Sequence, residues 1–134
     1  MARPASRYPT ELELQILKIL WRQGPLDGRQ LRNALAAGQG HMARDLAHTS
    51  VLTILNIMVR KKYVRRIKHD RSHRYHPRIG EQLVRRDMLR DLVARVFDGS
   101  ASAVVQDLLR NADIDEQEVR RVRQIIDARS RETT

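Results

Sequence analysis

Apolar residues recur at helical spacing along most of the chain, and the breaks between these runs predict six helices. The first follows Pro9, begins with the capping-box pattern Thr10-x-x-Glu13 and ends at Gln23-Gly24-Pro25. The second begins at Asp27 and ends at Gly38-Gln39-Gly40, before a loop from His41 to Ala47. Residues 1–8 have no such pattern and are predicted to be a loose basic arm.

The third predicted helix begins near Thr49 and has two distinct faces. Its apolar stripe, flanked by Ile54, consists of Val51, Leu55 and Met58. The opposite stripe is polar and consists of Thr49, Thr53, Asn56 and Arg60. A helix of this kind is held by its apolar face and leaves short polar side chains free for contacts.

A β-hairpin is predicted directly after this helix. Tyr63–His69 and His73–Pro77 are short and β-prone, and Asp70-Arg71-Ser72 has the composition of a turn. The alternation is imperfect, because Val64 and Ile67 are three residues apart.

Three further amphipathic helices follow, over residues 82–97, over residues 101–111, and from the capping residue Asp115 onward. Together they are a marginal core for an independent domain, and pairing with a second copy would bury their stripes. The alternative is that they pack on the preceding domain. We expect a dimerisation region whose contacts include Leu92, Val96, Leu108, Val122 and Ile126.

Charge separates these two regions. The net charge of the chain is +10, and residues 1–82 carry all of it, with 16 Lys and Arg against 6 Asp and Glu. Residues 83–134 hold 10 of each sign. Such asymmetry predicts a polyanionic partner for the first region. A membrane surface is the rival polyanion, but it favours large apolar anchors, and the chain has one Trp and one Phe.

Several function classes are excluded or disfavoured. The chain has no cysteine, so disulfides, thiolate catalysis and cysteine-based metal sites are excluded. No hydrolase, nucleotide-binding or metalloprotease motif is present, which argues against an enzyme and against a cofactor. The spacing of His69, His73 and His76 does not place three ligands on one strand face, so no metal site is predicted. Without a leader-like or membrane-spanning apolar run, we expect a cytoplasmic protein.

The polar helix face and the basic hairpin together predict a DNA-binding surface. Short polar side chains suit base edges in the major groove, and a dense run of cations suits phosphates. The predicted base contacts are Thr49, Ser50, Thr53 and Asn56. The predicted phosphate contacts are Arg60, Lys61, Arg65, Arg66, Lys68, Arg71 and Arg74. Two alternatives stay open: an architectural nucleic-acid binder without sequence preference, and an adaptor whose basic hairpin docks an acidic protein.

The order and spacing of four short motifs resemble the penicillinase-repressor family of the BlaI/MecI type. The first runs from Thr10-Glu11-Leu12-Glu13 through Leu20-Trp21 to Gly24-Pro25. The second, AHTSVLTIL at 47–55, is close to the family's A-Y-T-T-V-L-T-L-L. The others are RYHP at 74–77 and FDGS at 97–100, and the resemblance covers residues 9–127.

This resemblance implies a mainly α-helical fold: a winged helix-turn-helix domain over residues 1–80 and a helical dimerisation domain over residues 81–134. It implies a homodimeric repressor bound to a palindromic operator, often of antibiotic-resistance or membrane-protease genes. In that family, a membrane sensor-protease pathway can relieve repression through cleavage in the dimerisation region. A copper-responsive branch carries a cysteine-rich motif, which this chain lacks.

Four positions depart from the family pattern. Asn56 and Ile57 stand where two arginines are frequent, so a different operator is expected. Lys62 replaces a common glycine at the end of the helix, and His48 replaces a frequent tyrosine.

Overall fold

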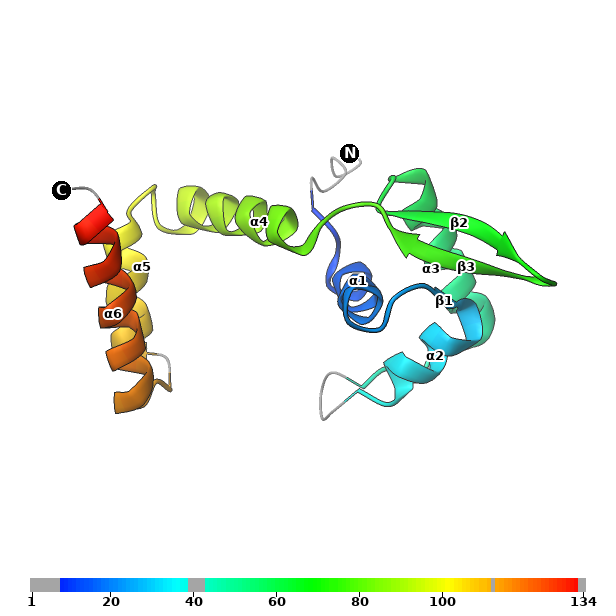
Figure 1. Cartoon of the computed structure of the whole chain (residues 1–134), viewed down its shortest axis with the longest axis horizontal. Coiled ribbons are helices and arrows are strands. Elements are labelled where there is room, and N and C mark those ends of the chain that lie inside the picture. Colours follow the sequence, from blue (N-terminus) through cyan, green and yellow to red (C-terminus); the bar gives the residue numbers. More distant parts are fainter. Residues whose placement is uncertain (1–7, 39–42, 112, 133–134) are drawn as a thin grey trace. The chain divides into compact units, whose positions relative to one another are not determined.

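The computed structural model describes residues 8–38, 43–111 and 113–132. These residues form the predicted mainly helical fold, with six helices and one small antiparallel sheet (Figure 1). The chain divides into two compact units, residues 1–88 and 89–134, here called the head unit and the tail unit. Residues 1–7 of the basic arm predicted over residues 1–8, and the start of the predicted loop at His41, lie outside the described residues.

Three helices begin the head unit: α1 (Glu11–Gln23), α2 (Gly28–Ala36) and α3 (His48–Arg60). The predicted capping box of α1 is present, and Gly24 ends the helix at a φ of 87° that suits glycine. Asp27 caps α2 as predicted, because its carboxylate accepts a hydrogen bond from the backbone N–H of Gln30. Helix α2 ends at Ala36, before Gly38, where its end was predicted.

The hairpin strands are β2 (Val64–His69) and β3 (Ser72–Pro77). His69 pairs with Ser72, so the turn holds two residues rather than the predicted three. Asp70 takes the left-handed φ of 54° that such a tight turn requires, and aspartate tolerates that conformation.

A third strand, β1 (Leu26–Asp27), was not predicted. It pairs with Tyr75 and Arg74, which gives the sheet the order β1-β3-β2. Two residues are too few for an alternating pattern, so this strand depends on the partner that tertiary packing supplies.

One apolar core holds α1, α2, α3 and the sheet together. The predicted stripe of α3 is fully buried in it, and Val64 and Tyr75 add the inner face of the sheet. The remaining fully buried or nearly buried members are Ile16, Leu17, Leu20, Leu31 and Leu35.

Helix α4 (Glu81–Val96) begins in the head unit and continues into the tail unit, which also holds α5 (Ala101–Asn111) and α6 (Glu116–Glu132). Within the head unit, Val84 is buried and the Trp21 Nε1 donates to the backbone oxygen of Ile79 at 2.9 Å. Asp115 caps α6 as predicted, through the backbone N–H of Glu118. No helix in the described part of the chain is long and apolar enough to cross a bilayer.

Candidate nucleic-acid interface

Helix α3 presents its polar stripe to solvent. Its three buried side chains, Val51, Leu55 and Met58, fix the rotation of the helix about its own axis. The predicted base contacts on the opposite face are all exposed: Thr49, Ser50, Thr53 and Asn56. The buried stripe therefore determines which side chains can meet a ligand.

Hydrogen bonds define what two of these side chains offer. The Thr53 hydroxyl donates to the backbone oxygen of Thr49 at 2.9 Å, so its oxygen lone pairs and its methyl group remain for a ligand. The Asn56 Oδ1 accepts from the Arg66 Nη1 at 3.3 Å. The Nδ2 amino group of Asn56 is the donor that remains.

The cations of the hairpin lie on both of its faces. Cross-strand pairing puts Arg66 opposite Tyr75, which is buried, so Arg66 lies on the inner face beside α3. Lys68 shares that face by alternation, whereas Arg65 and Arg74 belong to the outer one. All of these side chains are exposed, as is Arg71 in the turn. The hairpin can thus contact a polyanion from two sides.

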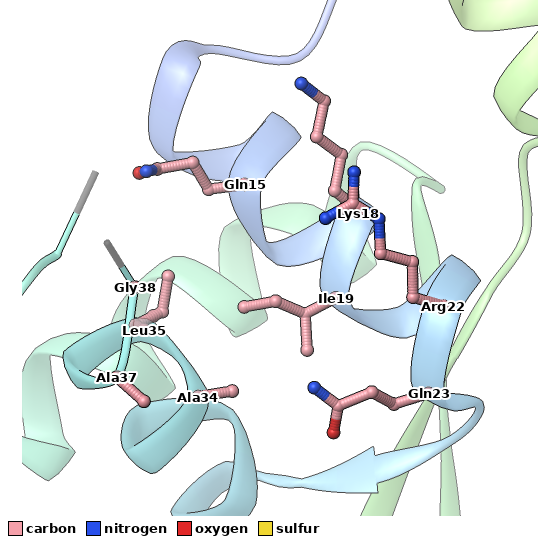
Figure 2. Close-up of a pocket in the computed structure, with 9 residues that line it drawn as sticks. All are labelled: Gln15, Lys18, Ile19, Arg22, Gln23, Ala34, Leu35, Ala37 and Gly38. Atoms are coloured by element: carbon pink, nitrogen blue, oxygen red, sulfur yellow. The ribbon is translucent and has the colours of Figure 1, made fainter. Parts of the chain in front are cut away.

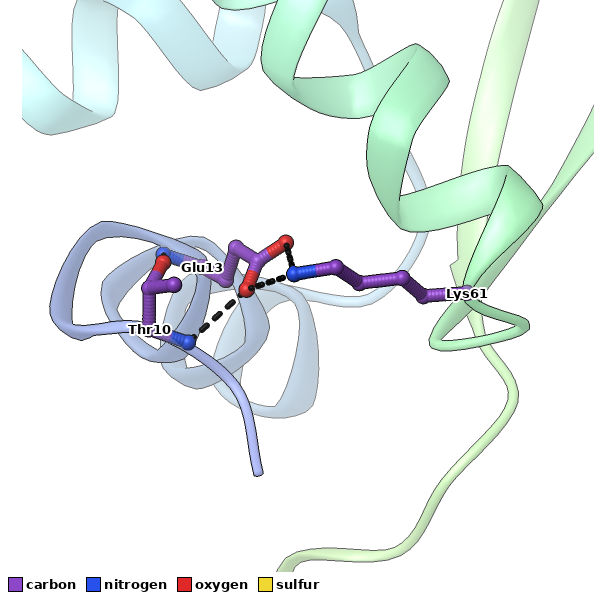
Figure 3. A network of polar contacts seen from close by, with 3 residues as sticks. All are labelled: Thr10, Glu13 and Lys61. Carbon is purple, nitrogen blue, oxygen red and sulfur yellow. Dashed lines mark hydrogen bonds and ion pairs between the residues drawn. The ribbon is translucent and has the colours of Figure 1, made fainter. Parts of the chain in front are cut away.

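Lys61 is placed differently from the other predicted phosphate contacts. Its ammonium group lies 3.1 Å from both carboxylate oxygens of Glu13, whose side chain is almost fully buried (Figure 3). The Glu13 Oε1 also accepts from the backbone N–H of Thr10 at 2.8 Å. This network joins the start of α1 to the end of α3, so Lys61 is committed to an internal ion pair.

Tyr63 lies beside the ion pair of Lys61 and Glu13. The Lys61 ammonium lies 5.7 Å from the centre of the Tyr63 ring, within reach of a cation–π interaction. Burial raises the pKa of the Tyr63 hydroxyl, the Lys61 charge opposes that rise, and Glu13 adds to it.

The turn from α3 into the hairpin is a Schellman motif. The Tyr63 N–H bonds the Met58 oxygen and the Lys62 N–H bonds the Val59 oxygen, with Lys62 at a φ of 66°. Lys62 stands where the family pattern commonly has a glycine, and it keeps the Schellman turn. Its left-handed backbone conformation is strained, because lysine, unlike glycine, has a Cβ.

Replacing Lys62 with glycine should relieve this strain. We expect Lys62→Gly to stabilise the chain by about 0.5–1 kcal/mol, since the left-handed conformation costs an ordinary residue about 1–2 kcal/mol and glycine loses part of that gain in entropy. Urea unfolding measures the change, and a destabilised variant would contradict the assignment of strain.

A pocket of about 240 Å³ lies where α2, α3 and the sheet meet. Arg29, His48 and His73 line it, and the His48 Nδ1 is buried with no hydrogen-bond partner among the described residues. The Gly28 Cα lies against this site, since an added Cβ would be 3.0 Å from Leu52 and 3.3 Å from His48. Sequence patterns did not identify Arg29 as a neighbour of this surface. Nothing in the described residues gathers three metal-ligating side chains.

A larger hollow of about 370 Å³ lies between α1 and the end of α2 (Figure 2). Its walls include Lys18, Ile19, Arg22 and Leu35. None of the predicted DNA contacts lines it, so it is separate from the candidate interface.

The predicted dimer contacts are distributed over three helices. Leu92 and Val96 lie on α4, Leu108 on α5, and Val122 and Ile126 on α6. Val122 is partly exposed and the other four are exposed. Within residues 89–111 and 113–132, no side chain is fully or nearly buried.

The chain is similar to known transcriptional regulators. The Penicillinase repressor family matches residues 9–128. The "Transcriptional regulator BlaI" of Mycobacterium tuberculosis, in strains CDC 1551 / Oshkosh and ATCC 25618 / H37Rv, is 34% identical over 113 residues, which cover 83% of this chain and 78% of that protein. The family match covers the head unit from residue 9 and most of the tail unit, and it is a match to regulators rather than to enzymes. The chain belongs to the penicillinase repressor family of transcriptional regulators.

Proposed function

We propose that this chain is a homodimeric transcriptional repressor that binds a palindromic DNA operator. The observation that carries the proposal is the orientation of α3, whose buried stripe leaves Thr49, Thr53 and Asn56 exposed beside a hairpin rich in arginine and lysine. A helix of this kind can lie in the major groove while the hairpin contacts the neighbouring backbone.

The roles of the side chains follow from their chemistry. Thr49, Ser50, Thr53 and Asn56 meet base edges, because short polar groups reach them without displacing the helix. Phosphate contacts come from the exposed cations Arg60, Arg65, Arg66, Lys68, Arg71 and Arg74. Lys61 instead holds α3 against α1 through Glu13.

Dimerisation is proposed for the tail unit. Its helices expose large apolar side chains, with Val96 63% and Ile126 51% exposed, and its described residues include no buried core. A second copy would remove these surfaces from water, and a twofold dimer matches a palindromic site. We propose that the DNA-binding domain ends at residue 80 and that the dimerisation domain begins at residue 81, with α4. The dimerisation domain therefore includes all of α4 and the tail unit.

Control of the repressor would act on the same region. If operator affinity depends on the dimer, a cut in the tail unit releases both half-sites at once. We therefore propose relief by proteolysis there, triggered through a membrane sensor-protease pathway, with antibiotic-resistance or membrane-protease genes as targets. Mapping fragments of the chain in cells exposed to β-lactams tests this step.

Thr53 provides the test of base contact. We expect Thr53→Ala to weaken binding to the operator by about 5- to 100-fold and binding to scrambled duplex by less than twofold, since a base contact carries about 1–3 kcal/mol of discrimination. Fluorescence anisotropy on both duplexes measures this. Arg60→Ala, on the same helix, is the matched control and should weaken both duplexes alike. Equal losses for Thr53→Ala would refute its base contact.

A further inference from the structure

Asn56 and Arg66 form a contact that joins α3 to the hairpin. The Arg66 Nη1 donates to the Asn56 Oδ1 at 3.3 Å. Strand register supports the same placement, because Arg66 shares a face with Val64, and Val64 is buried in the core against α3. The contact is therefore a consequence of how β2 lies on the helix.

This contact changes which bases Asn56 can bind. A free asparagine amide pairs with adenine by accepting from N6 and donating to N7. Here one of the two lone pairs of the accepting oxygen already receives the cationic Arg66 guanidinium, and the Asn56 amino group and the other Arg66 N–H groups are all donors. Asn56 and Arg66 together present mainly donors, with a guanidinium beside the one Oδ1 lone pair that remains.

We propose that Arg66, rather than contacting a phosphate, acts with Asn56 as one donor unit that selects guanine over adenine at the base pair which Asn56 contacts. Guanine displays two acceptors, N7 and O6, in the major groove, whereas adenine displays a donor, its N6 amino group, in place of O6. An N6 donor that faces two further donors loses its hydrogen bond. The inference rests on the proposed function, that α3 lies in the major groove.

The experiment is a binding selection from a random duplex library, with the full chain and three variants. Asn56→Ala identifies the contacted position, as the one where base preference is lost. At that position the unmodified chain should enrich guanine over adenine by about tenfold. Arg66→Ala should switch the preference to adenine, since the freed amide can then make both adenine bonds. A purely structural role for Arg66 would not produce that switch.

Arg65→Ala is the matched control. Arg65 is exposed on the outer face of the same strand, so its loss should lower affinity for all sequences and leave the guanine preference unchanged. If Arg66→Ala still prefers guanine and loses affinity for all sequences alike, the inference is overturned and Arg66 is a phosphate contact. A preference that does not depend on Asn56 would overturn it as well. No enriched sequence for the unmodified chain would overturn the proposed function itself.

Discussion

Replacing Lys61 with methionine is expected to lower the free energy of unfolding of the head unit by about 2–3 kcal/mol. Methionine keeps the apolar stem but removes the charge, which leaves the Glu13 carboxylate buried without its cation. Breaking a buried ion pair on one side costs about 3–5 kcal/mol, and the partial exposure of Lys61 reduces that figure. Urea unfolding followed by Trp21 fluorescence reports on the head unit, because Trp21 is the single tryptophan.

Two further variants make this measurement specific. Lys68→Met removes an exposed lysine from β2 and should change stability by less than about 0.5 kcal/mol. The double variant Glu13→Gln with Lys61→Met should recover part of the loss, since glutamine can still accept from the Thr10 N–H. If Lys61→Met has the same free energy of unfolding as the unmodified chain, and its DNA binding depends less steeply on salt, Lys61 is a phosphate contact.

The second large effect is expected in the tail unit. Leu108→Asp combined with Ile126→Asp places two carboxylates per chain on the exposed apolar surface of α5 and α6. We expect the dimer dissociation constant to rise at least about a hundredfold, since each central apolar contact of an interface can contribute about 2 kcal/mol. Sedimentation equilibrium should then find a monomer at concentrations where the unmodified chain is a dimer. Operator affinity should fall with it.

The control introduces the same charges at polar positions of the same helices. Gln106→Asp combined with Gln124→Asp adds two carboxylates at residues that are already exposed. This variant should remain dimeric and bind the operator with its original affinity. A dimer that survives Leu108→Asp with Ile126→Asp would show that α5 and α6 do not carry the interface.

Local sequence patterns predicted most of the elements. The Thr10 and Asp27 caps, the buried stripe of α3 and the extent of α5 follow from side chains within one or two helical turns. Such features depend on hydrogen bonds and spacing that the chain satisfies locally. The exposed polar stripe of α3 was predictable for the same reason.

Contacts between distant residues were not predictable. Strand β1 exists because β3 offers a free edge, and Lys61 meets Glu13 across 48 positions of sequence. The run of lysine and arginine residues in the sequence predicted Lys61 to be a phosphate contact, like the cations next to it. The contact of Arg66 with Asn56 likewise depends on the register of β2 against α3, which one-dimensional spacing does not contain.

The central claim is that the chain recognises a particular DNA sequence, and a gel-shift titration at two salt concentrations tests it most directly. The full chain is titrated on the DNA upstream of its own gene and on scrambled duplex of the same length. Charge contacts weaken steeply with salt, whereas base contacts maintain discrimination. We predict binding to the upstream DNA that remains selective at the higher salt. Equal binding to both duplexes, lost together as salt rises, would contradict the claim and leave a cationic surface without sequence preference.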